Sequence, residues 1–206
     1  MPTMTRISCP GFAILKDGDR YGLLTDMESH SGLMPIGGAL HADARGIAKI
    51  MQEFEAPTNS FEHAAALRFA VPTAQVPNVV DWFATRKDRD TSVGRVLRNA
   101  LFEETGVLTR SQAASITDRF VGYARGTGQT FRNVRERNTL YLIELYVVTV
   151  PRAAMSALRQ QALARRSHFR FATADEIRAG KLAINDAPIH PIATSLLNPS
   201  KTIPRG

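Results

Sequence analysis

The segment TLYLIELYVVTV, residues 139–150, constrains the fold more than any other part of this chain. It is rich in aromatic and β-branched residues, and this composition predicts a strand. Apolar residues recur at helical spacing in residues 42–54 and 151–166 instead. Because predicted strands and helices follow one another along the chain, we expect a layered domain of the mixed α/β or α+β class.

Shorter signals give the order of the other elements. Asp17-Gly18 stands between two apolar runs and predicts a β-hairpin. Residues 65–72, AALRFAVP, are a short strand candidate, and residues 76–90 predict a short helix that ends in a charged turn. Residues 120–138, FVGYARGTGQTFRNVRERN, are rich in glycine and arginine, and we expect them to form a connection.

Composition limits the class of protein. The chain has 206 residues, of which 44% are hydrophobic, so it can bury a proper core. Cys9 is the single cysteine, which excludes a disulfide framework and a four-cysteine zinc site. No apolar run is long enough to span a bilayer, and the first residues lack the apolar centre of a signal peptide. We therefore expect a cytoplasmic protein without a membrane partner.

The charge of the chain points to an anionic partner or to a basic surface. The formal net charge is +7, and arginine greatly outnumbers lysine. Arginine is the usual residue for bidentate contacts with phosphate. A nucleotide, a nucleic acid or another polyanion would suit this charge, but so would a solvated basic surface with no specific partner.

A pair of glutamates raises a more specific question. In LRNALFEETGVL, residues 97–108, a helix capped by Thr91 or Ser92 is predicted to run to Glu104. A helical projection places Glu104 near the middle of the apolar arc and Glu103 at its edge. Carboxylates are disfavoured at a helix C-terminus and in an apolar environment, so a bound Mg²⁺ or Mn²⁺ would explain the pair. Alternatively, the helix ends earlier and the carboxylates are solvated or paired with arginine.

The segment LFEETGV, residues 101–107, resembles the second half of the Nudix box, G-x5-E-x7-R-E-U-x-E-E-x-G-U, where U is aliphatic. Four further segments, in the right order, resemble other landmarks of a Nudix domain: GFAILKDGDRYGLL the opening hairpin, MPIGGAL the L-P-G-G segment, NTLYLIELYVV the central strand and FRFATADEI the closing strand. The resemblance implies an α/β fold, a Nudix-like α/β/α sandwich with a mixed sheet. It also implies a single domain over residues 1–206, with a helical insertion at about residues 42–89.

The chain departs from the box pattern in two respects. Asn99 and Ala100 stand where the family has Arg-Glu, and that glutamate commonly helps to bind metal or to polarise water. The box is also interrupted after Gly38. This interrupted form, with LRF at residues 67–69 and WF at residues 82–83, resembles the SMODS-associated Nudix-like domains of bacterial conflict systems. That group is thought to sense or process nucleotide-derived signals, which implies a role in antiviral defence.

The resemblance implies hydrolysis of a nucleoside-diphosphate-linked compound, with Mg²⁺ or Mn²⁺ as the cofactor. Glu103 and Glu104 would be the catalytic and metal-binding residues, together with the backbone carbonyl of Gly37 or Gly38. Arginines of residues 124–137 would bind the phosphates of the substrate: Arg125, Arg132, Arg135 and Arg137.

Two other functions compete with hydrolysis. Ala100 favours a catalytically degenerate nucleotide-binding or sensor module, because a methyl group cannot bind metal or accept a proton. A nucleic-acid-binding domain rests on net charge alone and ranks last. Two further features stay open: Glu144 faces either solvent or a pocket, and the histidines, which have no metal-like spacing, are expected to be surface or core residues. The sequence indicates neither the substrate nor the oligomeric state.

Overall fold

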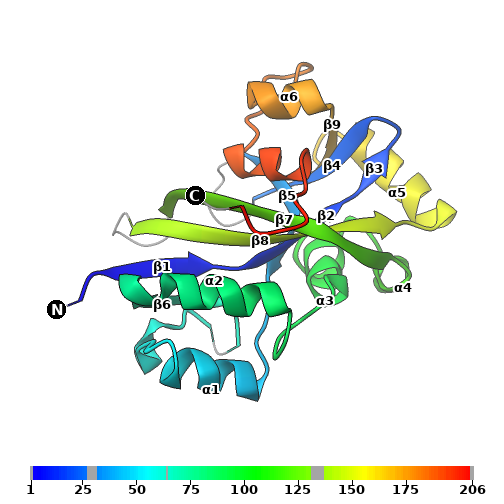
Figure 1. Ribbon diagram of the computed structural model, residues 1–206. Helices are drawn as coiled ribbons and strands as arrows, with labels where there is room; N and C mark the ends of the chain where they lie inside the picture. Colours follow the sequence, from blue (N-terminus) through cyan, green and yellow to red (C-terminus); the bar gives the residue numbers. More distant parts are fainter. Residues whose placement is uncertain (1, 27–31, 64, 131–136, 205–206) are drawn as a thin grey trace.

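The computed structural model describes residues 2–26, 32–63, 65–130 and 137–204 (Figure 1). The strands are β1 Met4–Ser8, β2 Pro10–Ile14, β3 Lys16–Asp17, β4 Arg20–Thr25, β5 Leu33–Ala39, β6 Arg68–Pro72, β7 Thr117–Thr130, β8 Arg137–Thr149 and β9 Phe169–Ala172. The α-helices are α1 Ala44–Gln52, α2 Val76–Thr85, α3 Gly94–Arg98, α4 Arg110–Ala114, α5 Arg152–Leu163 and α6 Ala174–Ala179. A π-helical turn, Asn99–Glu104, continues α3, and short 3₁₀ helices span Thr58–Ser60, Thr73–Gln75 and Pro191–Leu196.

The strongest strand signal in the sequence becomes the central strand, β8. The start of β8 runs parallel to β1 and its second half runs parallel to β2, while β7 pairs with it in the antiparallel direction. The order of strands in the sheet is β3-β4-β5-β2-β8-β1-β6, with β7 paired to β8 and β9 paired to β4 outside this path. The sheet is therefore mixed, as predicted.

Both faces of β8 are buried, which explains why its sequence is apolar almost throughout. Leu140, Leu142 and Tyr146 belong to one apolar core, whereas Ile143 and Leu145 belong to a second one. Successive residues of a strand point to opposite faces of the sheet, so the two cores lie on opposite sides of β8.

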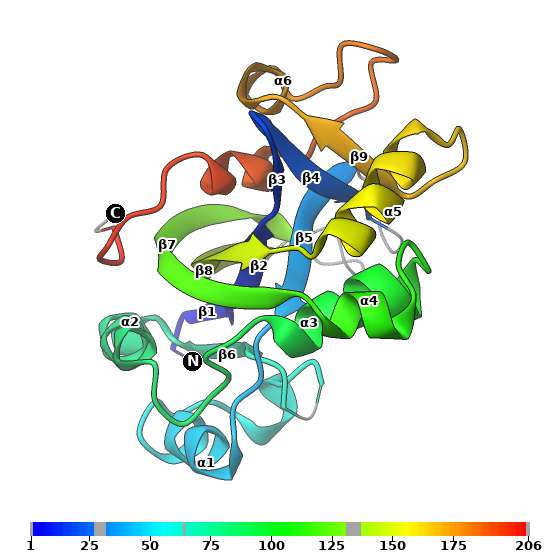
Figure 2. The same ribbon diagram turned by 90° about the vertical axis from the view of Figure 1, so that its right-hand side faces the viewer.

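Helices cover each of these cores, and this gives the layered architecture that the sequence predicts. Leu97 of α3 and Leu158 of α5 belong to the first core. Ile177 of α6 and Leu196 of the last 3₁₀ helix belong to the second. Figure 2 shows α3 and α5 apart from α6 and that 3₁₀ helix, with the curled sheet between them. The fold is a Nudix-like mixed α/β fold. Among the helices of the described residues, none has the length and apolarity to cross a membrane.

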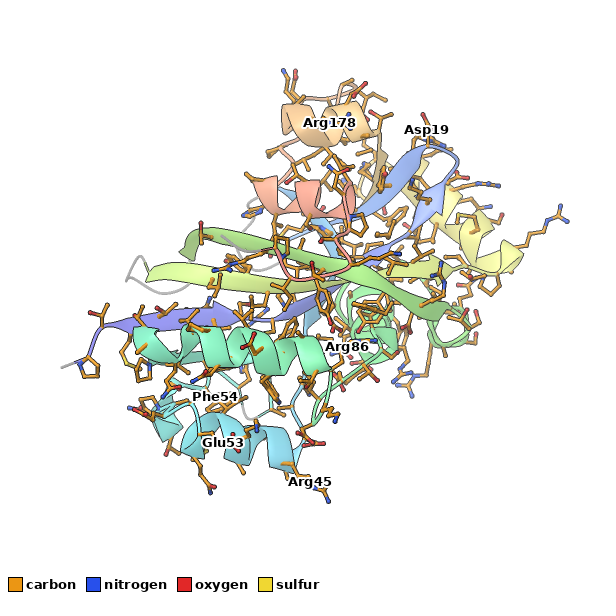
Figure 3. The ribbon with its side chains drawn as sticks, in the orientation of Figure 1. Asp19, Arg45, Glu53, Phe54, Arg86 and Arg178 are labelled. Atoms are coloured by element: carbon orange, nitrogen blue, oxygen red, sulfur yellow. The ribbon has the colours of Figure 1, made fainter. Side chains whose placement is uncertain are left out.

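The segment between residues 42 and 89 contributes two helices and one strand. Strand β6 pairs antiparallel with β1 and forms the end of the sheet. In Figure 1, α2 lies below β1 and α1 lies below α2, and Figure 3 shows Phe54 near both helices. The ring centroids of Phe54 and Trp82 are 5.9 Å apart. The ends of the segment meet, because Ala42 and Arg89 form an isolated antiparallel bridge. The segment is thus helical in part, and it also extends the sheet.

The glycine- and arginine-rich residues expected to form a connection are a strand over most of their described length. Strand β7 pairs with β8 from Thr117 to Thr130, with a bulge between Phe120 and Gly122. The prediction was wrong for this part because strand pairing with β8 and ring packing outweigh the low strand propensity of glycine. Phe120 packs its ring against Tyr123 at 5.0 Å and against Tyr146 at 5.7 Å.

Candidate functional site

A cavity of about 410 Å³ lies between β5, the helix that continues into the π turn, and the segment of residues 42–89. Its walls combine the end of the sheet with residues from the 3₁₀ helix near the C-terminus. The polar side chains that line it are Arg6, Ser8, Thr25, Asp26, His41, His63, Arg68, Arg95, Asn99, Glu104, Thr105, Tyr141 and His190. Arginine and histidine outnumber carboxylates on these walls.

Most of the residues predicted from the box resemblance lie in this cavity. Gly37 and Gly38 of β5 line one wall, while Asn99, Ala100 and Glu104 line another. Glu103 is not among the lining residues. The two halves of the interrupted box therefore meet in space, although residues 42–89 separate them in the sequence.

The helix that carries the glutamates changes its winding before it reaches them. Helix α3 begins after Val93 without a side-chain cap, although Ser92 Oγ accepts the N–H of Gly94 at 3.0 Å. From Asn99 the backbone adopts π-helical hydrogen bonding. The turn ends at Gly106, whose positive φ of 60° suits a residue just beyond a helix C-terminus. Thus the predicted helix end is confirmed, and the predicted cap is not.

The π turn moves both glutamates away from the positions expected in an α-helix. A π turn contains more residues than an α turn, because its hydrogen bonds span five residues instead of four. Each residue therefore advances by less than the ~100° of an α-helix. This difference shifts both side chains from their positions in the α-helical projection, and of the two only Glu104 is among the described lining residues of the cavity.

Both glutamates are exposed to solvent. The expectation that Glu104 points into the apolar core was wrong. Both carboxylates are solvated, as the alternative states, although the helical turn does not end earlier. The projection failed because it assumed regular α-helical periodicity through residue 104. Burial of a charge, the argument that led to a metal ion, therefore does not apply to either side chain.

The donors in the cavity fit only a partial metal site. Among the described residues, no group of three His, Cys, Asp or Glu side chains is placed to hold a metal ion. Glu104 and the carbonyl groups of Gly37 and Gly38 are oxygen donors of the kind that Mg²⁺ and Mn²⁺ prefer, but Ala100 contributes none. Mg²⁺ is commonly held by one or two carboxylates together with the phosphates of a substrate. These residues fit a site that a phosphate-bearing ligand would complete.

Two arginines of the cavity are held by partners within the protein. Arg6 Nε donates to Oε1 of Glu62 at 2.6 Å, and its Nη1 donates to Thr139 Oγ1 at 2.9 Å. Arg95 Nη2 donates to Oδ2 of Asp90 at 2.7 Å and to the carbonyl oxygen of Ala39 at 3.0 Å. These ion pairs hold the two guanidinium groups in place in the cavity wall.

Two histidines of the cavity, His41 and His190, have a lowered pKa, which favours their neutral form. Burial and the nearby Arg95 guanidinium lower the pKa of His41. Burial lowers the pKa of His190, although Asp26 acts in the opposite direction. Nδ1 of His190 accepts the backbone N–H of Ile192 at 3.1 Å, so the proton of its neutral ring is on Nε2. The expectation that every histidine is an ordinary surface or core residue missed this grouping, because His41, His63 and His190 come from distant segments.

Of the four arginines predicted to bind phosphate, the structure describes the side chain of Arg125, which is not among the described lining residues of the cavity. Arg125 lies on β7, and its Nη1 donates to the carbonyl oxygen of Pro204 at 3.3 Å. Arg132 and Arg135 lie outside the described residues, as does the side chain of Arg137. Their proposed role stays a prediction. The cavity is lined instead by Arg6 of β1, Arg68 of β6 and Arg95 of α3. The sequence did not associate these elements with phosphate.

Glu144 faces neither solvent nor this cavity. Its carboxylate is fully buried and forms ion pairs with Arg86 and Arg89. The hydroxyl group of Tyr146 donates to Oε2 of Glu144. Arg86 lies at the end of α2, next to the central strands (Figure 3). Glu144 therefore attaches the segment of residues 42–89 to β8.

Comparison with known families gives one match, which covers most of the chain. The family described as the SMODS-associated NUDIX domain matches residues 4–197. No curated protein matches the chain. The matched range includes β5, the π turn and the segment of residues 42–89, and so includes every element that contributes to the cavity.

Proposed function

The chain belongs to the SMODS-associated NUDIX domain family, and on this premise we propose that its cavity recognises a nucleotide-derived ligand through the phosphate groups of that ligand. The observation that supports this proposal most is the charge of the cavity. Arginines from β1, β6 and α3 line it, whereas Asp26 and Glu104 are the carboxylates among its described lining residues. An arginine-rich concave site suits phosphate, because the guanidinium group can donate two parallel hydrogen bonds to it.

Recognition without turnover is the form of this function that the cavity favours. Ala100 lines the cavity at the position where the Nudix box has a glutamate. Its methyl group can neither hold a cation nor accept a proton from water. A sensor module that has kept its ligand cavity and lost its chemistry accounts for this substitution. A role of this sensor in bacterial antiviral defence, within the cytoplasm, is part of the proposal.

Ligand binding to the purified protein tests this proposal. Thermal unfolding would be measured with ADP, inorganic pyrophosphate, a panel of nucleoside mono-, di- and triphosphates, and adenosine. A ligand that binds only the folded state raises the melting temperature, and the effect grows with the ratio of ligand concentration to Kd. We expect phosphate-bearing compounds to stabilise the protein more than adenosine does. Equal effects of ADP, pyrophosphate and adenosine would contradict the proposal.

Metal-dependent hydrolysis of a nucleoside-diphosphate-linked compound is the second candidate. It is favoured by Glu104 and Gly38, which line the same cavity. Glu104, with Glu103 beside it and the carbonyl of Gly37 or Gly38, would hold Mg²⁺ or Mn²⁺. A bound divalent ion supplies charge neutralisation at the diphosphate and activates water. Chromatography of nucleoside diphosphate compounds incubated with the protein and either metal tests this candidate, and Glu104→Gln should abolish any turnover found.

Nucleic acid remains the third candidate partner, and only the net charge of +7 supports it. Binding of this kind depends steeply on salt, because phosphate contacts release counterions. Titration of single-stranded DNA and RNA at two salt concentrations would measure this dependence. A ligand that competes for the cavity should leave such binding unchanged if the two partners use different surfaces.

A further inference from the structure

Strand β6, which lies within residues 42–89, brings an arginine into line with two other cavity residues. In the register of the sheet, Ser8 of β1 pairs with Arg68 of β6 on one side and with Tyr141 of β8 on the other. Directly paired residues in neighbouring strands point to the same face of the sheet. All three line the cavity. They form a polar row of Arg68, Ser8 and Tyr141 across one end of the cavity wall.

Arg68 differs from the other arginines of the cavity because it has no fixed partner. Its side chain forms no hydrogen bond and no ion pair with any residue that the structure describes. Glu62, whose charge acts on Arg68, is engaged by Arg6 at 2.6 Å. Arg95 is engaged by Asp90. The guanidinium donors of Arg68 are therefore free to bind a ligand.

The surroundings of Arg68 make its charge costly in the absence of an anion. The side chain is half-buried. Burial lowers the pKa of Arg68 below the ordinary value, and the charges of Glu62 and Glu104 oppose that shift only in part. A partly desolvated cation gains more from an anionic partner than an exposed one does, because water screens the interaction less. An arginine kept in this state within a cavity is suited to binding.

We infer that Arg68 is the specificity-determining residue that binds a phosphate group of the ligand, and that residues 42–89 thereby give the cavity its preference for phosphorylated compounds. This inference rests on the proposed function, since it assumes a ligand in the same cavity. The planar fork of Arg68 donates two hydrogen bonds to the phosphate oxygens. Tyr141, two strands away in the same row, offers a hydroxyl group and an aromatic ring to the adjoining part of the ligand.

Binding of ADP and adenosine, measured by isothermal titration calorimetry, tests this inference. The wild type would be compared with Arg68→Gln, which removes the charge, and with Arg68→Lys, which keeps the charge but loses the fork. Arg119→Gln is the matched control, because Arg119 is an exposed arginine on β7 outside the cavity wall. It changes the net charge by the same amount as Arg68→Gln.

The ratio of the two affinities is the readout. We expect Arg68→Gln to weaken ADP binding about 10- to 100-fold and to leave adenosine binding unchanged, since one charged hydrogen-bonded contact accounts for that range. Arg68→Lys should fall between the two proteins, and Arg119→Gln should match the wild type. The melting temperature of unliganded Arg68→Gln should not fall, because the side chain has no described partner to lose.

The two levels of the proposal fail in different ways. If the wild type binds neither ADP nor pyrophosphate, the proposed function is wrong, and the inference about Arg68 falls with it. If the wild type prefers ADP over adenosine and Arg68→Gln keeps the same preference, the cavity binds phosphate through other residues and the inference alone is wrong. An equal loss of ADP binding in Arg119→Gln would show a general charge effect and would also overturn the assignment of Arg68.

Discussion

Arg89 donates from Nη2 to Oε1 of Glu144 at 2.6 Å, and neither side chain is exposed to solvent. The same Nη2 donates to the carbonyl oxygen of Phe83 at 2.6 Å. Arg86 adds a second ion pair to Glu144 at 3.0 Å. These contacts fix the end of the segment of residues 42–89 to the central strand, while the pairing of β6 with β1 places Arg68 in the sheet.

Glu144→Gln should destabilise the protein severely, by about 3–5 kcal/mol, because it leaves the charge of Arg89 buried without an opposite charge. Urea denaturation at neutral pH would measure the free energy of unfolding. The double variant Glu144→Leu/Arg89→Met should lose less stability than either single charge removal, since it leaves no fully buried charge unpaired and Arg86, which also loses its carboxylate, is 25% exposed. The exposed pair of Arg159 and Asp17 gives a control, and Arg159→Gln should change stability little. A Glu144→Gln variant as stable as the wild type would contradict this account.

Gly37→Ala should destabilise the protein more than Gly38→Ala. A Cβ atom on Gly37 would lie 2.1 Å from the carbonyl oxygen of Gly11, and backbone there cannot move without disturbing the pairing of β2 and β5. A Cβ atom on Gly38 would meet only a methyl group of Val96, at 3.0 Å. We expect a cost of at least about 2 kcal/mol for Gly37→Ala and less than about 1 kcal/mol for Gly38→Ala.

Urea denaturation of both glycine variants would check this order. Gly38 and Val96 line the cavity, so Gly38→Ala should also weaken ligand binding in a protein that remains folded. Equal stability losses in the two variants would contradict this account, because they would show that the close approach of β2 to β5 does not make Gly37 the more sensitive position.

The large elements of this fold could be predicted because their signals are local. The hairpin at Asp17-Gly18 forms between β3 and β4 as expected. Thr173 caps α6 with a capping box, and Gly180 ends that helix in the left-handed conformation. In each case a few neighbouring residues determine the backbone conformation, independently of distant packing.

The candidate site was predicted only in part, because it depends on geometry that no local pattern specifies. The box match associated Gly38 with Glu104, and both line the cavity, but helical periodicity could not show the π turn in which Glu104 is exposed. Arg68 drew attention only as part of a family resemblance. Its role in the cavity follows from the register of β6 against β1, which pairs residues that are 60 positions apart in sequence, Ser8 and Arg68.

The protein should lose stability as the pH falls from about 7.5 to about 5.5, and His190 should account for part of the loss. The pKa of His190 in the folded state is below its ordinary value of 6.5, so the unfolded chain binds more protons in this range. Protonation of Nδ1 also removes the acceptor for the N–H of Ile192. His190→Asn keeps a capping acceptor and does not titrate, so its stability should depend less on pH.

Urea denaturation of the wild type and His190→Asn at both pH values would measure the difference in slope. Some pH dependence should remain in the variant, because the pKa of His41 is also lowered. An identical slope in the two proteins would show that His190 is not part of the effect. A wild type that gains stability toward pH 5.5 would contradict the assigned direction for both histidines.

Ala100→Glu should convert the partial metal site into a stronger one. Ala100 is 3% exposed and lines the cavity together with Glu104, one helical turn away. A second carboxylate there should destabilise the protein without metal, because it places a charge in a poorly solvated position. Mn²⁺ or Mg²⁺ should restore that loss by binding both carboxylates. In the wild type, we expect either metal to raise the melting temperature clearly only when ADP is also present, since the phosphates complete the set of ligands.

Thermal melts of the wild type, Ala100→Glu and Glu104→Gln, each with and without metal and ADP, would decide the matter. Glu104→Gln should leave the apo melting temperature nearly unchanged, because Glu104 is exposed and has no hydrogen-bonding partner among the described residues. It should abolish the additional stabilisation that metal gives in the presence of ADP. Glu104→Gln could instead destabilise the apo protein, with no effect of either metal on the wild type or on Ala100→Glu. In that case the glutamate is structural and the cavity holds its ligand without a cation.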